Sequence, residues 1–284
     1  FDFLNRKVVA VGSSTTNAVV TVTGAATVAQ LNTINGLTTG IVTTDAAQTY
    51  SLADANTLTL NLDANGAQVV DGNGDAVQNA YAIIVSDTSA DAASLTSLKT
   101  RTSVNINLTN VATVTGTIAT VDTLIAAAGH ANLTNPITTL SDAGSIDADA
   151  LQRINAASTG VATVSGTVTN LTGAGAAVAA LFAGNAQNAG VVFTANPTAT
   201  VTGASAAVAD VNNINAATSG LVTVNAATLT GSEADLNTAL TAAAGNTPTI
   251  AGIGAVNLTV AANDGVAIAD LSTLTSRTTG VVTA

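Results

Sequence analysis

Two short acidic segments carry the residues best suited to chemistry in this sequence. Asp63-Ala-Asn65-Gly and Asp71-Gly-Asn73-Gly-Asp75 place carboxylate and amide oxygens on alternate residues beside glycines. Hard cations such as Ca²⁺ take about six to eight oxygen ligands of this kind, so Ca²⁺ is a candidate cofactor. The alternative is a pair of plain hairpin turns in which Asp and Asn supply the turn geometry.

Further acidic residues stand where short helices are expected to begin. We interpret them as charges that stabilise helix N-termini, and only secondarily as metal ligands. They are Asp147, Asp149, Glu233, Asp235 and Asp264.

Catalytic chemistry has little support. The chain has no cysteine, which excludes zinc–thiolate, iron–sulfur and disulfide chemistry. Its single histidine, His130, follows Ala-Ala-Ala-Gly in an expected loop and has no recurring nucleophile partner. Asp142 could pair with a neighbouring carboxylate, but the aromatic platforms on which sugars stack are missing. We therefore predict that the protein is not an enzyme.

Charge and hydropathy exclude two classes of partner. Six Lys and Arg against 17 Asp and Glu give a formal net charge of -11, which argues against a nucleic-acid partner because phosphate binding needs clustered basic residues. The longest apolar run, residues 174–183, is far shorter than the roughly 20 residues of a membrane-spanning helix. With 47% hydrophobic residues and only two Tyr and four Phe, the chain is expected to fold around Val, Ile, Leu and Ala.

A block with helical spacing followed by a strand recurs along the chain. Successive copies begin about 30 residues apart, within the range of stacked repeat proteins. The interval between Leu31 and Leu95 is about twice as long, so one copy there is degenerate or replaced by an insertion. The clearest copies are residues 24–43, 144–163, 203–223 and 265–283, and weaker ones are residues 89–98, 114–124, 173–181 and 230–240.

Each copy predicts a short helix between two strands. Val28, Leu31 and Ile34 lie three residues apart and mark one face of a helix. The polar residue in front of each helix is its expected N-cap. Examples are Thr27, Ser145 and Ser232.

Two residue types mark the end of each copy. A glycine after Thr or Ser is expected to end the helix in the left-handed conformation; these glycines are Gly40, Gly160, Gly220 and Gly280. An asparagine after Ile either bonds the backbone of its own and the neighbouring repeat, as in an asparagine ladder, or simply terminates the helix. These asparagines are Asn35, Asn155 and Asn215.

A unit this short buries little surface alone, so it must stack on its copies. The sequence therefore predicts a β-rich solenoid with short helices and parallel strand ladders; the alternative is a tandem array of small β-sandwich domains. We expect three regions: residues 1–49 with an N-terminal strand and the first repeat, residues 50–86 as an inserted β-meander, and residues 87–284 as a continuous repeat array. Within the insertion, residues 57–63 alternate like a strand and residues 81–85 form another.

The repeat pattern resembles a known repeat style. Val-Thr-Gly, followed by Ala-Asp-Leu-x-x-Ile-x-x-x-Thr-Thr-Gly-Val-Val-Thr, is similar to the Ala/Thr/Val/Asn-rich tandem repeats of giant secreted bacterial surface proteins. These include motility and adhesin-like proteins of marine cyanobacteria and S-layer or fibrous proteins. The resemblance implies an extracellular or cell-surface location and a structural or adhesive role, often with calcium.

Both ends of the sequence are apolar and strand-like, whereas solenoids normally end in polar caps. The residues concerned are Phe1, Phe3, Leu4, Val281 and Val282. We expect such ends to contact further copies of the chain, head to tail or edge to edge, and a contact that does not close builds a filament or a surface layer. The predicted function is a self-assembling extracellular structural protein. The alternative is a monomeric adhesin whose exposed face binds glycans or ice.

Overall fold

The computed structural model describes residues 2–3, 6–9, 17–63, 65–133, 136–158, 162–183, 191–261 and 267–284. For residues 2–3, 6–9 and 191–195 only the backbone is described. The chain forms two compact units. One comprises Phe1–Gly116 and Thr123–Ile137, and the other Thr117–Asp122 and Thr138–Ala284. The predicted three-region organisation concerns the repeats and stays a prediction.

The protein has an α/β fold of short helices and mostly parallel strands that does not close into a barrel. Parallel pairing connects each repeat to the next, because the strands of one repeat lie beside those of the repeat that follows. Sandwich domains would instead be built from antiparallel sheets. The alternative prediction of tandem sandwiches is therefore wrong.

The first unit contains short elements throughout. They are β1 (Asp2–Phe3), β2 (Arg6–Val9), β3 (Val20–Val22), α1 (Val28–Asn35), β4 (Val42–Thr44), β5 (Gln48–Tyr50), α2 (Leu52–Ala55), β6 (Ile83–Val85), β7 (Ser89–Asp91), α3 (Ala92–Lys99), β8 (Ile106–Asn107), β9 (Thr113–Gly116) and β10 (His130–Ala131). Helix α4 (Ile118–Ala126) and strand β11 (Ile137–Leu140) each contain residues of both units.

The second unit continues the same alternation of strands and helices. Its elements are β12 (Gly144–Asp147), α5 (Ala148–Ala157), β13 (Thr163–Gly173), α6 (Gly175–Phe182), β14 (Val191–Val201), β15 (Ser205–Ala207), α7 (Val208–Ala217), β16 (Val222–Val224), β17 (Thr228–Gly231), α8 (Glu233–Ala242), β18 (Ile250–Ala251), η2 (Ile253–Ala255), β19 (Asn257–Val260), α9 (Ile268–Arg277) and β20 (Val282–Thr283). A repeat is named below by its helix.

Parallel ladders in the first unit link β3 to β4, β7 to β9, and β5, β6, β8 and β10 in that order. The N-terminal strands differ. Strand β2 pairs with β3 in antiparallel register, with Val8 opposite Val22, and β1 pairs with β2 in the same sense. An N-terminal strand is thus present as predicted, but it belongs to a hairpin that covers the outer edge of β3.

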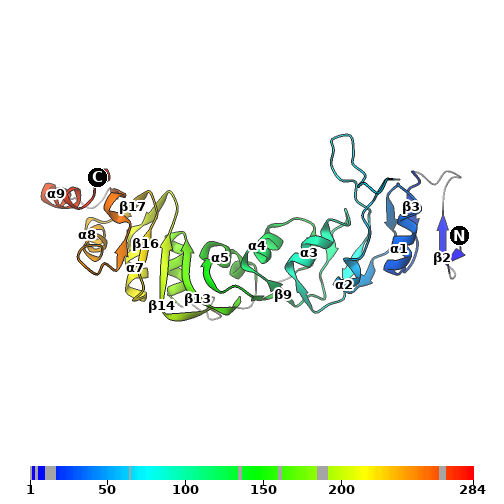
Figure 1. Cartoon of the computed structure of the whole chain (residues 1–284), viewed down its shortest axis with the longest axis horizontal. Coiled ribbons are helices and arrows are strands. Elements are labelled where there is room, and N and C mark those ends of the chain that lie inside the picture. Colours follow the sequence, from blue (N-terminus) through cyan, green and yellow to red (C-terminus); the bar gives the residue numbers. More distant parts are fainter. Residues whose placement is uncertain are drawn as a thin grey trace. The chain divides into compact units, whose positions relative to one another are not determined.

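Two ladders run through the second unit. Strands β13, β14, β16 and β18 form one, and β15, β17, β19 and β20 form the other. All these pairs are parallel, and the register places Thr200 opposite Thr223 and Leu229 opposite Leu258. Helices α7 and α8 lie beside strands β16 and β17 (Figure 1).

The core consists of aliphatic side chains, as predicted. Val28, Leu31 and Ile34 are buried on one face of α1, and the corresponding positions of α3, α5 and α7 are buried in the same way. Among the largest fully buried side chains, Tyr81 is the one aromatic residue and the others are Leu or Ile. Helices α1, α3 and α7 each contribute two or three such apolar residues to the core.

Two of the three predicted N-caps are confirmed. The Thr27 hydroxyl accepts the Gln30 N–H in a capping box, and Ser232 accepts the Asp235 N–H at the start of α8. Ser145 instead lies in β12, and the N-cap of α5 is Asp147, whose carboxylate accepts two backbone N–H groups. Asp is an equally good N-cap, so sequence preference alone cannot separate the two positions.

The segment between Leu31 and Leu95 contains a degenerate repeat. Strand β5, the four-residue helix α2 and strand β6 follow the order of the other repeats, and β5 pairs with β6 in parallel. The inserted residues between α2 and β6 project from the first unit as a loop (Figure 1). The predicted strand at residues 57–63 is wrong, because only Leu62 there forms a β-bridge, to Gln68.

Candidate functional site

The two acidic segments form a pair of matching turns. The Asp63 carboxylate oxygen Oδ1 accepts the N–H groups of Asn65 and Ala67, each at 2.9 Å. In this arrangement the carboxylate holds the turn that Gly66 completes at φ +79°. The aspartate therefore supplies turn geometry, as the alternative interpretation of the sequence holds.

The second turn repeats this geometry. Asp71 Oδ1 accepts the N–H groups of Asn73 at 2.8 Å and Asp75 at 3.0 Å, and Gly74 has φ +86°. Within the described residues, no three His, Cys, Asp or Glu side chains are grouped so that they could hold a metal ion. Calcium binding at Asp63, Asn65, Asp71, Asn73 and Asp75 stays a prediction.

The other acidic candidates lie at helix N-termini, as interpreted. Asp147 is the N-cap of α5 and Asp149 lies in its first turn, while Glu233 and Asp235 lie in the first turn of α8. Asp149 also reaches the next repeat, because its Oδ2 accepts the Ala174 N–H at 2.8 Å. Asp264 lies outside the described residues.

The three repeat asparagines occupy different environments. Asn155 Oδ1 accepts the N–H of Ala162 in its own segment, and Asn215 Oδ1 is buried without a hydrogen-bond partner. Asn35 is the last residue of α1, whereas Asn155 and Asn215 are followed by two more helical residues. Their surroundings therefore differ, and a common role in a ladder or in helix termination stays a prediction.

Asn35 does connect separate segments of the first unit. Its amide nitrogen donates to Thr59 Oγ1 and to the Leu60 carbonyl, both at 2.7 Å, and its Oδ1 accepts the Asn79 amide at 2.9 Å. Asn79 is fully buried and accepts the Val42 N–H at 2.9 Å. Because an unpaired buried amide is costly, this network fixes how the insertion joins the first repeat.

In three repeats a threonine bonds the strand that follows the helix to the strand that precedes it. Thr38 donates its hydroxyl to the Ala18 carbonyl at 2.6 Å and accepts the N–H of Gly40 at 2.9 Å. Thr218 makes the same pair of bonds to Pro197 and Gly220. We call this arrangement, found at Thr38, Thr218 and Thr278, the threonine latch.

Each latch requires a glycine because the adjacent strand leaves no room for a β-carbon. A β-carbon at Gly40 would overlap the Ala18 carbonyl oxygen, and one at Gly220 or Gly280 would overlap the corresponding carbonyl on the adjacent strand. None of these three glycines has a positive φ, so the predicted left-handed helix ending is wrong for them. Gly160 lies outside the described residues. The latch was visible in the sequence as Thr-x-Gly, but its partner on the neighbouring strand was not.

The latch gives the interface between repeats a direction. The later strand supplies the threonine and glycine, and the earlier strand supplies the carbonyl oxygen. Because the two faces differ, an interface of this kind is heterologous. The first repeat departs from the pattern at its outer edge: the β3–β4 register places Ala18 where the latch has Gly40, and β2 covers β3. This edge therefore cannot copy the internal interface.

The last repeat exposes apolar positions that other repeats bury. Helices α7 and α9 are both ten residues long and carry their apolar residues in the same register. Val208 is 0% exposed, whereas the equivalent Ile268 is 87% exposed. Leu271 is half-buried, whereas the equivalent Val211 is fully buried. In α5 the same two positions, Ala148 and Leu151, are also fully buried.

The internal repeats show what covers these positions. A β-carbon at Gly231, at the end of β17, would overlap Val208 Cγ1, so the glycine backbone lies directly on that valine. In the same way, a β-carbon at Gly173 would lie 3.3 Å from Ala148 Cβ. A strand from the following repeat, ending in glycine, therefore covers the start of α5 and of α7. No described residue seals α9 at Ile268 in this way.

The predicted assembly residues lie partly at this surface. Val281 is 67% exposed and Val282 is half-buried in β20, which pairs with β19 at one edge. Phe3 belongs to β1, and Phe1 and Leu4 lie outside the described residues. We define the uncovered face as Ile268 and Leu271 of α9 together with β20.

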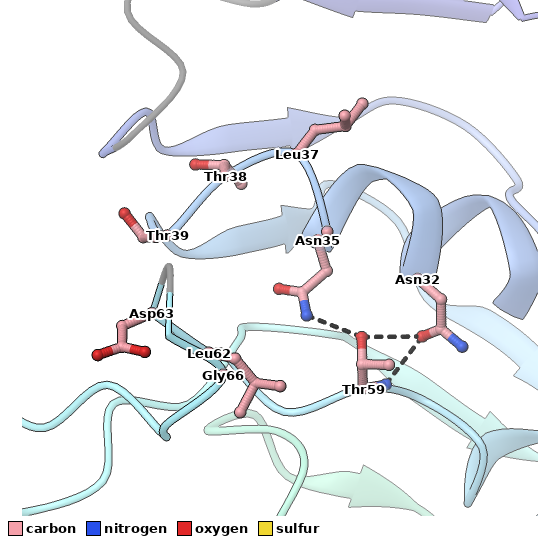
Figure 2. A pocket seen from close by; sticks show the side chains of 10 residues that line it. Asn32, Asn35, Leu37, Thr38, Thr39, Thr59, Leu62, Asp63 and Gly66 are labelled. Carbon is pink, nitrogen blue, oxygen red and sulfur yellow. Dashed lines mark hydrogen bonds between the residues drawn. The ribbon is translucent and has the colours of Figure 1, made fainter.

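A separate pocket of about 450 Å³ lies in the first unit, between the end of the α1 repeat and the insertion. Figure 2 shows the amide of Asn35 and the hydroxyl of Thr59 facing each other along one side, with Asn32 bonded to the same threonine. The described residues lining the pocket offer amides, hydroxyls, two leucines and one carboxylate, that of Asp63. This lining can contact a ligand rich in hydroxyl groups, but it lacks the paired groups of acid–base catalysis.

His130 lies beside the buried part of Lys99. The Lys99 ammonium donates to the carbonyls of Thr102 at 2.9 Å and Val104 at 3.3 Å, and Gly129 lies against its aliphatic stem. Burial lowers the pKa of His130, the Leu95 backbone opposes this, and the charge of Lys99 lowers the pKa further. The surroundings of His130 therefore favour its neutral form.

No known family model, curated protein or solved structure matches this chain. None of the helices in the described residues is long and apolar enough to cross a membrane.

Proposed function

We propose that this protein is a self-assembling extracellular structural protein whose repeats stack as a solenoid. Copies join through edge contacts at the uncovered face, Ile268, Leu271 and β20, and build a filament or surface layer. The role is structural rather than catalytic. The main support is the repeated contact between neighbouring strands at Thr38, Thr218 and Thr278, in which the later strand supplies the hydroxyl and the earlier strand the carbonyl oxygen.

Apolar area and backbone hydrogen bonds together favour such a contact. Burying an isoleucine side chain contributes about 1.5–3 kcal/mol, and β20 pairs with β19 at one edge while its second edge faces away from that partner. An unpaired strand edge beside exposed apolar side chains is a template for pairing with another chain. The directional latch between internal repeats supports a contact that does not close on itself.

The extracellular location rests on the resemblance of the repeats to those of secreted bacterial surface proteins. The acidic, cysteine-free composition is compatible with this setting. Copies of the chain are the proposed partner, without nucleic acid and without membrane insertion.

Assembly is tested by sedimentation and negative-stain microscopy of the purified chain across a concentration series. We expect elongated or layered particles that grow with concentration, and their loss in the Ile268→Asp variant. The control is Val70→Asp, because Val70 is also exposed, at 56%, but belongs to the inserted hairpin. A wild-type chain that stays monomeric at every concentration would show that the proposal is wrong.

The pocket in Figure 2 favours a second candidate function, a monomeric adhesin that binds glycans. Its amide and hydroxyl groups are of the kind that recognise sugar hydroxyls. A glycan array with the wild-type chain tests it, with Asp63→Asn as the matched variant because asparagine keeps the side-chain oxygen that closes the turn. Specific glycan binding by a chain that remains monomeric would favour the adhesin over the assembling protein.

A further inference from the structure

The pocket beside the insertion offers a ligand many hydrogen-bond acceptors and few donors. We propose that it binds an amino sugar, a hexosamine unit whose free ammonium group pairs with the carboxylate of Asp63. This deepens the second candidate function, on whose pocket it rests, by naming the class of sugar that the pocket accepts. It is independent of whether copies of the chain assemble.

The amides along the pocket are engaged by the protein itself. The amide nitrogen of Asn35 donates twice within the segment that contains Thr59, and its oxygen accepts the amide of Asn79. Asn32 Oδ1 accepts both the N–H and the hydroxyl of Thr59, and its amide nitrogen donates once, to the Thr57 carbonyl. Among the described lining residues, one N–H of Asn32 is therefore the side-chain amide donor left for a ligand.

The hydroxyl groups of the pocket donate their protons to the protein as well. The Thr38 hydroxyl donates to a backbone carbonyl at 2.6 Å, and Thr39 donates to Asn17 Oδ1 at 2.8 Å. Thr59 donates to Asn32 Oδ1 at 3.2 Å. A hydroxyl oxygen has two lone pairs, so each of these threonines can still accept a hydrogen bond from a ligand.

Asp63 supplies the strongest of the remaining acceptors. Its Oδ1 holds the turn through the N–H groups of Asn65 and Ala67, whereas no hydrogen bond within the described part of the chain engages Oδ2. The side chain is half-buried and lines the pocket, and none of the described lining residues is basic (Figure 2). A hydrogen bond from an ammonium group to a carboxylate is about twice as strong as one between neutral groups. The pocket therefore favours a cationic, donor-rich ligand.

The rest of the lining suits a sugar ring better than a plain alkyl ammonium ion. Leu37 and Leu62 are 57% and 36% exposed and offer apolar surface to the C–H groups of a ring. The hydroxyl groups of the same ring can donate to the three threonine oxygens. The volume of about 450 Å³ lies in the range of small-molecule sites. Ammonium, hydroxyl and C–H groups on one compact frame are the features of an amino sugar.

Glucosamine serves as the probe, titrated into the isotope-labelled full chain and followed by NMR. A chelator is present throughout, because calcium at Asp63 would compete with the ammonium group. We expect saturable shifts of the backbone amides that line the pocket, with a dissociation constant of about 1 mM. Glucose and N-acetylglucosamine lack the ammonium group and butylamine lacks the hydroxyl groups, so each should bind at least about fivefold more weakly.

Two aspartates that hold matching turns allow a controlled comparison. Asp63→Asn keeps the oxygen that accepts the turn N–H groups and removes the charge, so glucosamine should bind at least about fivefold more weakly. Asp71→Asn makes the same change in the second turn, outside the pocket lining, and should bind like the wild type. Leu37→Lys adds a positive charge at an exposed lining position and should also weaken binding, without altering either turn.

The outcomes distinguish this inference from the candidate function on which it rests. No glucosamine binding at concentrations about tenfold above the expected dissociation constant overturns the inference. Equal binding of glucose or butylamine, or equal binding by the Asp63→Asn and Asp71→Asn chains, overturns it too. A neutral glycan that binds more tightly than glucosamine would exclude the amino sugar and retain the adhesin, whereas a chain that binds no glycan would exclude both.

Discussion

Thr278 donates its hydroxyl to the carbonyl oxygen of Val256 at 3.0 Å, and the hydroxyl oxygen of Thr278 accepts the N–H of Gly280 at 3.0 Å. One side chain thus joins the starts of two adjacent strands that lie more than 20 residues apart in the sequence. Because the same arrangement recurs at Thr38 and Thr218, the contact between repeats depends on a small set of hydrogen bonds as well as on aliphatic packing.

Loss of a latch hydroxyl should destabilise the protein. Thr38 is buried, so Thr38→Val keeps the shape but leaves the Ala18 carbonyl and the Gly40 N–H without this partner. We expect the free energy of unfolding in urea to fall by about 1–3 kcal/mol. Thr33→Val is the control, because the exposed Thr33 hydroxyl bonds only within its own helix, to Ala29. Equal effects of the two substitutions would contradict the role of the latch.

The latch glycines should not tolerate a β-carbon. At Gly220 an alanine methyl group would overlap the Pro197 carbonyl oxygen, which is backbone and cannot rotate away. We expect Gly220→Ala to lower the free energy of unfolding by about 1–3 kcal/mol, as overpacking does in protein cores. The matched control in the same unit is Gly254→Ala, since the β-carbon position there has no atom within 4 Å. Denaturant melts of both variants measure the difference.

Stability should fall as the pH drops below the ordinary histidine pKa of 6.5. Burial lowers the folded-state pKa of His130, with the Lys99 charge adding in the same direction. Below pH 6.5 the unfolded chain therefore binds a proton more readily than the folded one, and protonation favours unfolding. We expect the melting temperature to decrease between about pH 7.5 and about pH 5, a range that brackets this pKa. The decrease should be smaller in His130→Gln, and an unchanged decrease would rule His130 out as its source.

A double substitution can distinguish calcium binding at the acidic turns from a purely structural role of the two aspartates. Replacing both Asp63 and Asp71 by Asn keeps a side-chain oxygen that can accept the same backbone N–H groups, but removes the negative charge that a cation needs. If Ca²⁺ binds there, added CaCl₂ raises the melting temperature of the wild type, chelation reverses the rise, and the double variant loses both responses. If the carboxylates only close the turns, the two proteins respond alike.

Local structure was largely predictable from the sequence. The three-residue spacing of Val28, Leu31 and Ile34 predicted helix α1, and Thr27 predicted its N-cap. Such features depend on residues within one turn of each other, so their spacing along the chain carries the information. The aliphatic core followed from composition, because the chain contains few aromatic residues to place there.

The inserted segment and the N-terminal strands were not predictable in detail. Residues 57–63 alternate like a strand, yet they find only the single bridge from Leu62 to Gln68. The Asn35 amide is instead bonded to Thr59 and Leu60 in this segment, which fixes it as irregular chain. In residues 57–63, specific long-range hydrogen bonds therefore override the local strand propensity.

The sequence by itself determined where helices form and that the chain is repetitive, because periodic apolar residues act locally. Only the tertiary structure decided which carbonyl each Thr-x-Gly meets, that Asn35 pairs with Asn79, and that Ile268 is left uncovered while Val208 is sealed. These relationships depend on strand register between segments more than 20 residues apart. A register is set by the combined fit of many contacts, and no single spacing in the sequence encodes it.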